Sequence, residues 1–286
     1  MASPPTNPLP ERVLAFEYPD GMDPAWSPRR PEFAYAANAV SLIMPFAEPY
    51  FVKSVRSALP QLGGTDRTTA EDYLRQELQH HVQHRRFNQI ITGHYPRLTR
   101  IERWMRRTYG WFSRTRSQRF NLAFAAGSET IAFTLARWTE HHLDELFTGA
   151  EPVPSTLFLW HLAEEVEHKS AAFDVYEAVD GSRLRYLVAM VMSFVILAWF
   201  TGISALTMMH ADRRLHHPVS WFRLLKWGLS FAWVGLPTLV VSSLPGHHPS
   251  DFTDPIWMSS WLTHFDPETG TIPEPSFLPP VALTLD

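Results

Sequence analysis

The sequence contains no cysteine. Disulfide bonds, zinc–thiolate sites and thiol nucleophiles are therefore excluded, which agrees with a reducing compartment. The N-terminal segment lacks the basic stretch followed by an apolar stretch that marks a signal peptide. The net charge is only −4, so nothing global indicates nucleic-acid binding. We expect a cytoplasmic protein with no nucleic-acid partner.

The alternating pattern typical of β-strands is also missing between residues 70 and 180. Apolar residues recur at helical spacing instead, and helices are predicted over roughly 46–59, 70–92, 99–109, 119–147 and 155–179. Residues 1–35 are rich in proline and lack periodicity, which predicts an extended arm. The predicted fold class is all-α, with a helical bundle over residues 36–182.

Charged residues are absent from two long segments, 187–209 and 227–244. Each is long enough to cross a bilayer. The loop between them is basic, however, and a spanning pair would place it on the side opposite the bundle, against the positive-inside tendency. We therefore expect residues 183–265 to form a hydrophobic helical hairpin packed on the bundle. Either it attaches to the inner face of a membrane in a peripheral or monotopic way, or it is buried, for example in a homodimer. Residues 266–286 read as a proline-rich tail.

A run of arginines with interleaved aromatic residues lies between residues 97 and 119, and Glu102 is its one acidic residue. Two explanations fit this pattern. The arginines either form a solvated basic face or contact an anionic membrane surface.

The most unusual stretch is WHLAEEVEHKSAAFDVY, residues 160–176. A helix advances about 100° per residue, so His161, Glu165 and His168 fall on one narrow stripe, with Glu164 at its edge. The flanking residues are apolar, which predicts burial, and buried carboxylates without partners are strongly disfavoured. A bound metal ion would remove this cost. Glu164 could replace Glu165 as a ligand through a small change of register.

The predicted helix at 70–92 repeats the pattern, with Glu77 and His80 three residues apart and His84 one turn later. A Glu-x-x-His motif from each of two helices, with one glutamate from each of two others, is the ligand set of di-iron carboxylate bundles. The single glutamates are Glu129, among small apolar residues, and Glu48, which we place at a helix end because a proline follows it. His84 is either a metal ligand, a residue that contacts a ligand without binding the metal, or an ordinary core histidine.

Four segments carry a resemblance to a known family: SVR beyond Glu48, QELQHHVQHRRFN, FAAGSETIAFT and LWHLAEEVEHKSAAFDVY. They resemble the bacterial proteins described as predicted metal-dependent hydrolases, a ferritin-like group, over about residues 46–186. Two positions depart from the family pattern: PFAE stands where PxGE is usual, and Thr130 stands where a histidine is common. The ligand order is also similar to that of di-iron arylamine N-oxygenases.

These resemblances imply a dinuclear centre in a ferritin-like bundle. The implied metal ligands are Glu48, Glu77, His80, Glu129, His161, Glu165 and His168, with Glu77 and Glu165 bridging two iron ions, or two manganese ions, and taking part in catalysis.

Three functions are compatible with such a centre. The leading hypothesis is an oxidase or oxygenase that uses O2 and an electron donor to oxidise a hydrophobic or aromatic small molecule. The alternative is a hydrolase that uses a metal-bound hydroxide. The third is a non-catalytic iron-binding or ferroxidase protein.

Overall fold

The computed structural model describes residues 9–19 and 21–274, and this part of the chain contains helices and no β-strand. An isolated bridge joins Asp266 and Thr271. The α-helices are α1 Pro31–Ser41, α2 Met44–Ala58, α3 Gly64–His94, α4 Leu98–Thr115, α5 Gln118–Glu140, α6 Leu143–Phe147, α7 Pro152–His168, α8 Ala171–Val179, α9 Arg183–Ala211, α10 Pro218–Ser242 and α11 Ile256–Leu262. The prediction of an all-α fold is confirmed.

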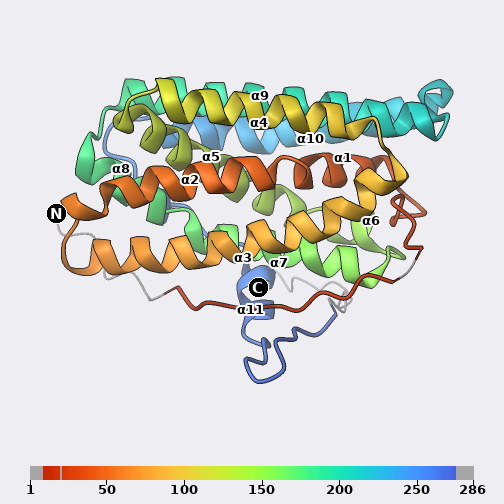
Figure 1. The fold of residues 1–286 in the computed structure, drawn as a ribbon, viewed down its shortest axis with the longest axis horizontal. Coiled ribbons are helices and arrows are strands. Elements are labelled where there is room, and N and C mark those ends of the chain that lie inside the picture. Colours follow the sequence, from red (N-terminus) through yellow and green to blue (C-terminus); the bar gives the residue numbers. More distant parts are fainter. Residues whose placement is uncertain (1–8, 20, 275–286) are drawn as a thin grey trace, which may run out of the picture.

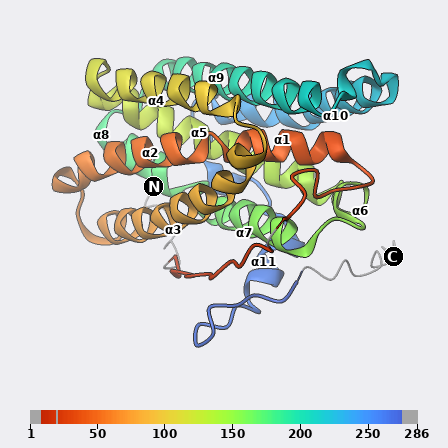
Figure 2. The same cartoon turned by 45° about the vertical axis from the view of Figure 1, so that its right-hand side comes forward.

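The long helices run roughly parallel or antiparallel in three layers (Figure 1). Helices α1, α2 and α5 form the middle layer. Helices α3 and α7 lie on one side of it, and α4, α9 and α10 lie on the other, an arrangement that Figure 2 shows again after rotation. Helix α5 is central, since it packs against α2, α7, α8, α9 and α10. The single glutamate at position 129 therefore lies in the middle of the molecule.

A glycine lets α5 and α9 approach each other closely. A Cβ added at Gly127 would lie 2.7 Å from the Cα of Met190, a separation that no side chain tolerates. Next to this crossing, the hydroxyl groups of Thr130 and Tyr186 are 2.6 Å apart and buried. This contact fixes the hydrophobic hairpin against the helix that carries Glu129.

Two helices predicted to be continuous are interrupted. The helix predicted over 119–147 breaks after Glu140, where the Nδ1 of His142 donates to the carbonyl of Trp138 and its backbone N–H bonds to Thr139 instead. The helix predicted over 155–179 breaks after His168, where the ammonium group of Lys169 reaches out to the carbonyl of Phe252. In both places a side-chain hydrogen bond to a backbone carbonyl accompanies the interruption.

The described part of the N-terminal arm, residues 9–19, runs without helix along α3 and α7 (Figure 1). Gln76 donates to the carbonyl of Pro10 at 2.8 Å, and Gln83 donates to the carbonyl of Leu14. The ring of Phe16 lies 5.8 Å from that of Trp160. The arm ends before residue 35, because α1 already begins at Pro31.

Helices α9 and α10 correspond to the two uncharged segments. Both are long and apolar enough to cross a membrane, with mean hydropathies of 2.1 and 1.5 over their most apolar windows. A short 3₁₀ turn, Arg214–His216, connects them, and the rings of Phe194 and Phe231 stack between them at 6.3 Å. They form the expected hairpin and pack on α5.

Candidate metal centre

Every residue that the sequence predicts at the site is buried, and all come from four helices. Glu48 lies on α2, Glu77, His80 and His84 on α3, Glu129 on α5, and His161, Glu164, Glu165 and His168 on α7; none exceeds 9% exposure. Glu48 lies within α2 and not at its end, since the helix continues through Pro49 to Ala58. Proline at this early position costs one backbone hydrogen bond without ending the helix.

Three imidazoles converge on one oxygen of Glu165. Its Oε1 lies 3.0 Å from Nε2 of His161, 3.4 Å from Nδ1 of His80 and 3.6 Å from Nδ1 of His168. Nδ1 of His168 also lies 3.1 Å from Oε1 of Glu77 and 3.7 Å from Oε2 of Glu129. Glu165 is therefore the point where side chains of α3, α5 and α7 meet.

The donor atoms fall into two groups, each able to hold a metal ion. The first comprises Glu77, His80, Glu165 and His168, whose ligand atoms all lie within 4.8 Å of one another. In the second group, Glu48, His84 and His161 satisfy the same limit. His161 joins the two groups, because its Nε2 faces Glu165 and its Nδ1 faces His84.

Many of these atoms are buried without a hydrogen-bond partner. The orphaned atoms include both carboxylate oxygens of Glu48, one oxygen each of Glu77 and Glu129, and Nδ1 of His80 and of His168. Buried polar atoms without partners cost roughly 1–3 kcal/mol each, so a cluster of them that faces one point needs an explanation. Metal coordination satisfies carboxylate oxygens and imidazole nitrogens of this kind.

The electrostatics of the cluster show how strongly its charges interact. Burial raises the pKa of Glu48 and of Glu129 well above the usual range, and the negative charges of Glu77 and Glu165 raise both further. Burial alone would also raise the pKa of Glu165, but the close approach of the surrounding histidines, His161 above all, holds the pKa well below the usual range. The carboxylates thus compete for the few positive charges available to them.

His80 and His168 each form a hydrogen bond through Nε2, the ring nitrogen that does not face Glu165. Burial opposes protonation of His80, but hydrogen bonding to Glu164 raises its pKa to about 10. The Nε2 of His80 lies 2.9 Å from Glu164, whose other oxygen accepts from Arg12 at 3.0 Å. The Nε2 of His168 donates to the side-chain oxygen of Gln76 at 2.7 Å. Carboxylates and amides in these positions orient imidazole ligands toward metals in other proteins.

Further residues around the site were missing from the sequence prediction. Tyr73 donates to Glu129 at 2.7 Å, and Ser41 lies 2.8 Å from Nδ1 of His84. Tyr73 lies four residues before Glu77 on α3, so helical spacing could have identified it. Arg12 gave no such signal, because it comes from the arm, where no periodicity exists.

The family comparison agrees with this geometry. The family model described as "Predicted metal-dependent hydrolase" matches residues 10–252, a range that includes Arg12, the four helices of the cluster and the hairpin. No curated protein and no solved structure matches the chain significantly. The matched range is most of the chain, and the chain accordingly belongs to the family of predicted metal-dependent hydrolases.

Proposed function

We propose that this protein is a dinuclear metal enzyme that hydrolyses a hydrophobic small molecule. The charge balance of the cluster supports two ions. Glu48, Glu77, Glu129 and Glu165 are buried and carry four negative charges when ionised, whereas the fifth glutamate, Glu164, is already paired with Arg12. Two divalent cations supply four positive charges, and the histidines can then be neutral, as metal ligands must be.

The distances support a specific division of ligands. His80 and His168 would hold the first ion with Glu77 and Glu165, and Glu129 would complete this side. The second ion would take His161, His84 and Glu48. Glu165 would serve both ions, because histidines of both groups converge on its Oε1. Glu77 would be the second shared ligand, as the resemblance of the sequence implies.

Hydrolysis is the reaction class that the family description names. A pair of divalent ions supplies Lewis acidity and an activated water for such a reaction. The chain provides an environment that excludes bulk water: the ring of Trp160 lies 4.9 Å from that of His80, and the ring of Phe158 lies 6.0 Å from that of His84. Aromatic walls of this kind favour an apolar substrate. We infer that substrate approaches from the side of His161, because it is the most exposed member of the cluster at 9%.

A second candidate is oxidation of a hydrophobic substrate by O2, with electrons from a separate donor. The observation that favours it is the donor set itself, which is rich in carboxylates, has a few imidazoles and contains no thiolate. Such donor sets suit iron or manganese. The same residues would hold two iron ions, which would supply the electrons for O2 chemistry.

Metal loading under controlled oxygen separates the two candidates. The apo-protein is loaded anaerobically with Mn(II), Zn(II) or Fe(II) and tested on p-nitrophenyl esters of increasing chain length. We expect about two ions per chain and metal-dependent ester cleavage without O2, lost in Glu165→Ala and retained in His142→Ala. Stoichiometric O2 uptake by the Fe(II) protein, with no ester cleavage under any metal, would favour the oxidase. Failure to bind any of the three metals would contradict both.

A further inference from the structure

Helices α9 and α10 leave a continuous apolar stripe exposed. On each helix the exposed residues recur every three or four positions, so they lie along one face. The stripe consists of Leu184, Val188, Val191, Val195, Trp199 and Leu206 on α9, and Phe222, Leu225, Leu229, Trp233, Leu236 and Val240 on α10. Trp233 is 85% exposed and Phe222 is 69% exposed. Apolar surfaces of this extent mark interaction sites in soluble proteins.

The exposed tryptophans are confined to the same side of the molecule. Among the eleven tryptophans, those exposed by more than a third are Trp104 and Trp111 on α4, Trp199 on α9, and Trp221 and Trp233 on α10. These three helices form one layer (Figures 1 and 2). Tryptophan is enriched where protein meets the boundary between lipid headgroups and acyl chains.

The layer is bordered by the arginines of α4, which greatly outnumber the carboxylates near them. Within the described chain, no ion pair joins an arginine of α4 to an acidic side chain, and Glu102 is the one acidic residue of that helix. The guanidinium of Arg100 instead lies 5.5 Å from the ring of Trp104, and that of Arg116 lies 4.5 Å from the ring of Trp111. The carboxylates that reach α9 and α10 are already engaged: Asp212 with Tyr35 and Tyr95, Glu32 with Arg223, and Glu145 with Lys226. Glu102 interacts with Arg106 and offsets one of these charges, and the five arginines of α4 leave the border with a net positive charge.

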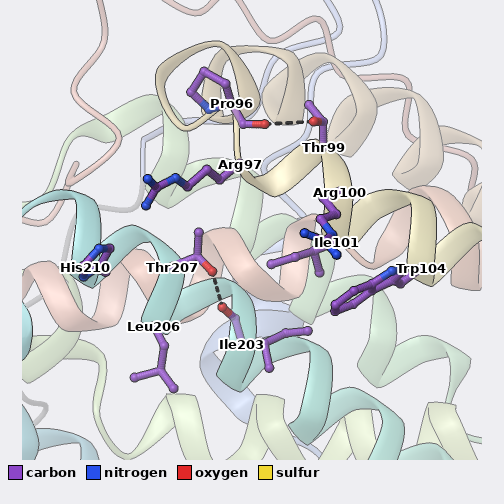
Figure 3. Close-up of a pocket in the computed structure, with 10 residues that line it drawn as sticks. All are labelled: Pro96, Arg97, Thr99, Arg100, Ile101, Trp104, Ile203, Leu206, Thr207 and His210. Carbon is purple, nitrogen blue, oxygen red and sulfur yellow. Dashed lines mark hydrogen bonds between the residues drawn. The ribbon is translucent and has the colours of Figure 1, made fainter.

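A groove connects the basic and apolar parts of this layer (Figure 3). It has a volume of about 610 Å³ and lies between the start of α4 and the end of α9. Arg97, Arg100 and Trp104 line one wall, and Ile203 and Leu206 line the other. Positive charge thus lies beside apolar side chains. A phospholipid is complementary to this surface, because its negatively charged phosphate adjoins its apolar acyl chains.

We propose that the layer of α4, α9 and α10 docks flat on a bilayer that contains anionic phospholipids. The apolar stripe enters the boundary between headgroups and acyl chains, roughly 5–10 Å deep. The arginines of α4 lie at the level of the phosphates, and Arg97 and Arg100 contact lipid phosphates at the groove. Charge complementarity selects anionic lipid, since each arginine near such a surface contributes favourably.

The packing of the hairpin explains why it lies along the membrane and does not cross it. Helix α9 runs along α5 and contacts both α1 and α4. A bilayer-spanning α9 would draw α4, with its arginines, into the hydrocarbon region, where charged side chains are expensive. Docking in the plane of the membrane leaves the bundle and the Glu/His cluster outside the lipid.

A second copy of the chain fits the same surface less well. A twofold dimer places the same patch on both partners. The arginines at the border of the layer would then face one another with few carboxylates between them, which disfavours association. An anionic surface has no such conflict.

Vesicle sedimentation tests the proposal with the full-length protein. Vesicles of phosphatidylcholine containing phosphatidylglycerol are compared with vesicles of phosphatidylcholine alone. We expect binding to the anionic vesicles at least about tenfold stronger. Trp233→Glu and the double variant Arg103→Glu/Arg107→Glu should each weaken it by on the order of tenfold. All three substituted side chains are exposed, so folding is preserved.

Matched controls lie on the opposite side of the molecule. Leu78→Glu on α3 replaces another exposed apolar residue, and Arg85→Glu/Arg86→Glu on α3 reverses two exposed arginines. These variants should bind vesicles as the unchanged protein does. Equal loss in the controls, or equal binding to neutral vesicles, would overturn the proposal. So would a dimer in solution that ignores vesicles and is dissociated by Trp233→Glu. Protection of the 211–220 loop from external protease in sealed vesicles would show a spanning hairpin and would also overturn it.

Discussion

The carboxylate of Glu164 lies 2.9 Å from Nε2 of His80, while the other nitrogen of the same imidazole faces Glu165 at 3.4 Å. Two adjacent glutamates on α7 thus hold one histidine from opposite sides. We expect Glu164→Gln to lower metal affinity by about 10–100-fold without abolishing binding, because the glutamine orients His80 less strongly. Glu165→Gln should abolish binding. Metal titration measures both, and Glu71→Gln on the exposed side of α3 is the control. Equal losses in Glu164→Gln and Glu165→Gln would show that Glu164 is itself a ligand.

Arg12 is the buried cation that balances this arrangement. It bonds Glu164 at 3.0 Å and both oxygens of Glu167 at 2.9 Å. Arg12→Met should destabilise the protein by about 3 kcal/mol, since the substitution leaves buried charge unpaired. Urea unfolding of the apo-protein measures the change. Arg85→Met, an exposed position on α3, should change stability by less than about 0.5 kcal/mol. Similar midpoints for the two variants would contradict the prediction.

Metal stoichiometry tests the division into two groups. Glu48 belongs to the second group alone, so Glu48→Ala should retain about one ion per chain. Glu165→Ala should retain none, because Glu165 contacts histidines of both groups. Elemental analysis of dialysed protein gives the counts, with His142→Ala as a variant that keeps both ions. Loss of both ions in Glu48→Ala would show that the two positions fill only together.

The crossing of α5 and α9 predicts a difference between two glycines. Gly127→Ala should destabilise the fold by about 1–3 kcal/mol, because the new methyl group meets the backbone of Met190 at 2.7 Å. Gly202→Ala, on α9, meets nothing within 4 Å and should be neutral or stabilising by up to about 1 kcal/mol. Thermal unfolding of the two variants compares them directly. A destabilised Gly202→Ala would point to crowding that the crossing does not explain.

Glu32 couples α1 to α10 in a pH-dependent way. Burial opposes its ionisation, but hydrogen bonds from Ser220 and Arg223 lower its pKa below the usual value. A lowered pKa stabilises the fold above the unfolded-state pKa of about 4.3, and this stabilisation is lost as the pH falls through the folded-state value. Glu32→Gln should therefore cost about 2 kcal/mol at pH 7 and progressively less below pH 4. Urea midpoints measured across that range should converge, whereas a constant gap would contradict the role of ionisation.

The sequence predicted the parts of this molecule that follow local spacing. Glu77 and His80, and likewise His161, Glu165 and His168, share helix faces by arithmetic alone, and the structure brings them together. The interruption after Glu140 involves a local bond of His142 to Trp138, which helical periodicity alone does not reveal. The interruption after His168 could not be predicted, because the contact of Lys169 beside it is with the distant residue Phe252. The same holds for Arg12. The role of His84 could not be predicted, because a histidine on an apolar helix face fits several environments. Its contact with His161 in the structure makes it part of the group formed by Glu48, His84 and His161.

The contact between Arg12 and Glu164 joins residues 152 positions apart. During synthesis the arm is made before α7, so its binding surface on α7 exists only after the 152 positions up to Glu164 have followed. Until then Glu48, Glu77, His80 and Glu129 are present without His161, Glu165 or His168, so a metal ion that arrives early meets an incomplete set of donors. Under the proposed function, complete metal loading therefore requires that α7 has already been made.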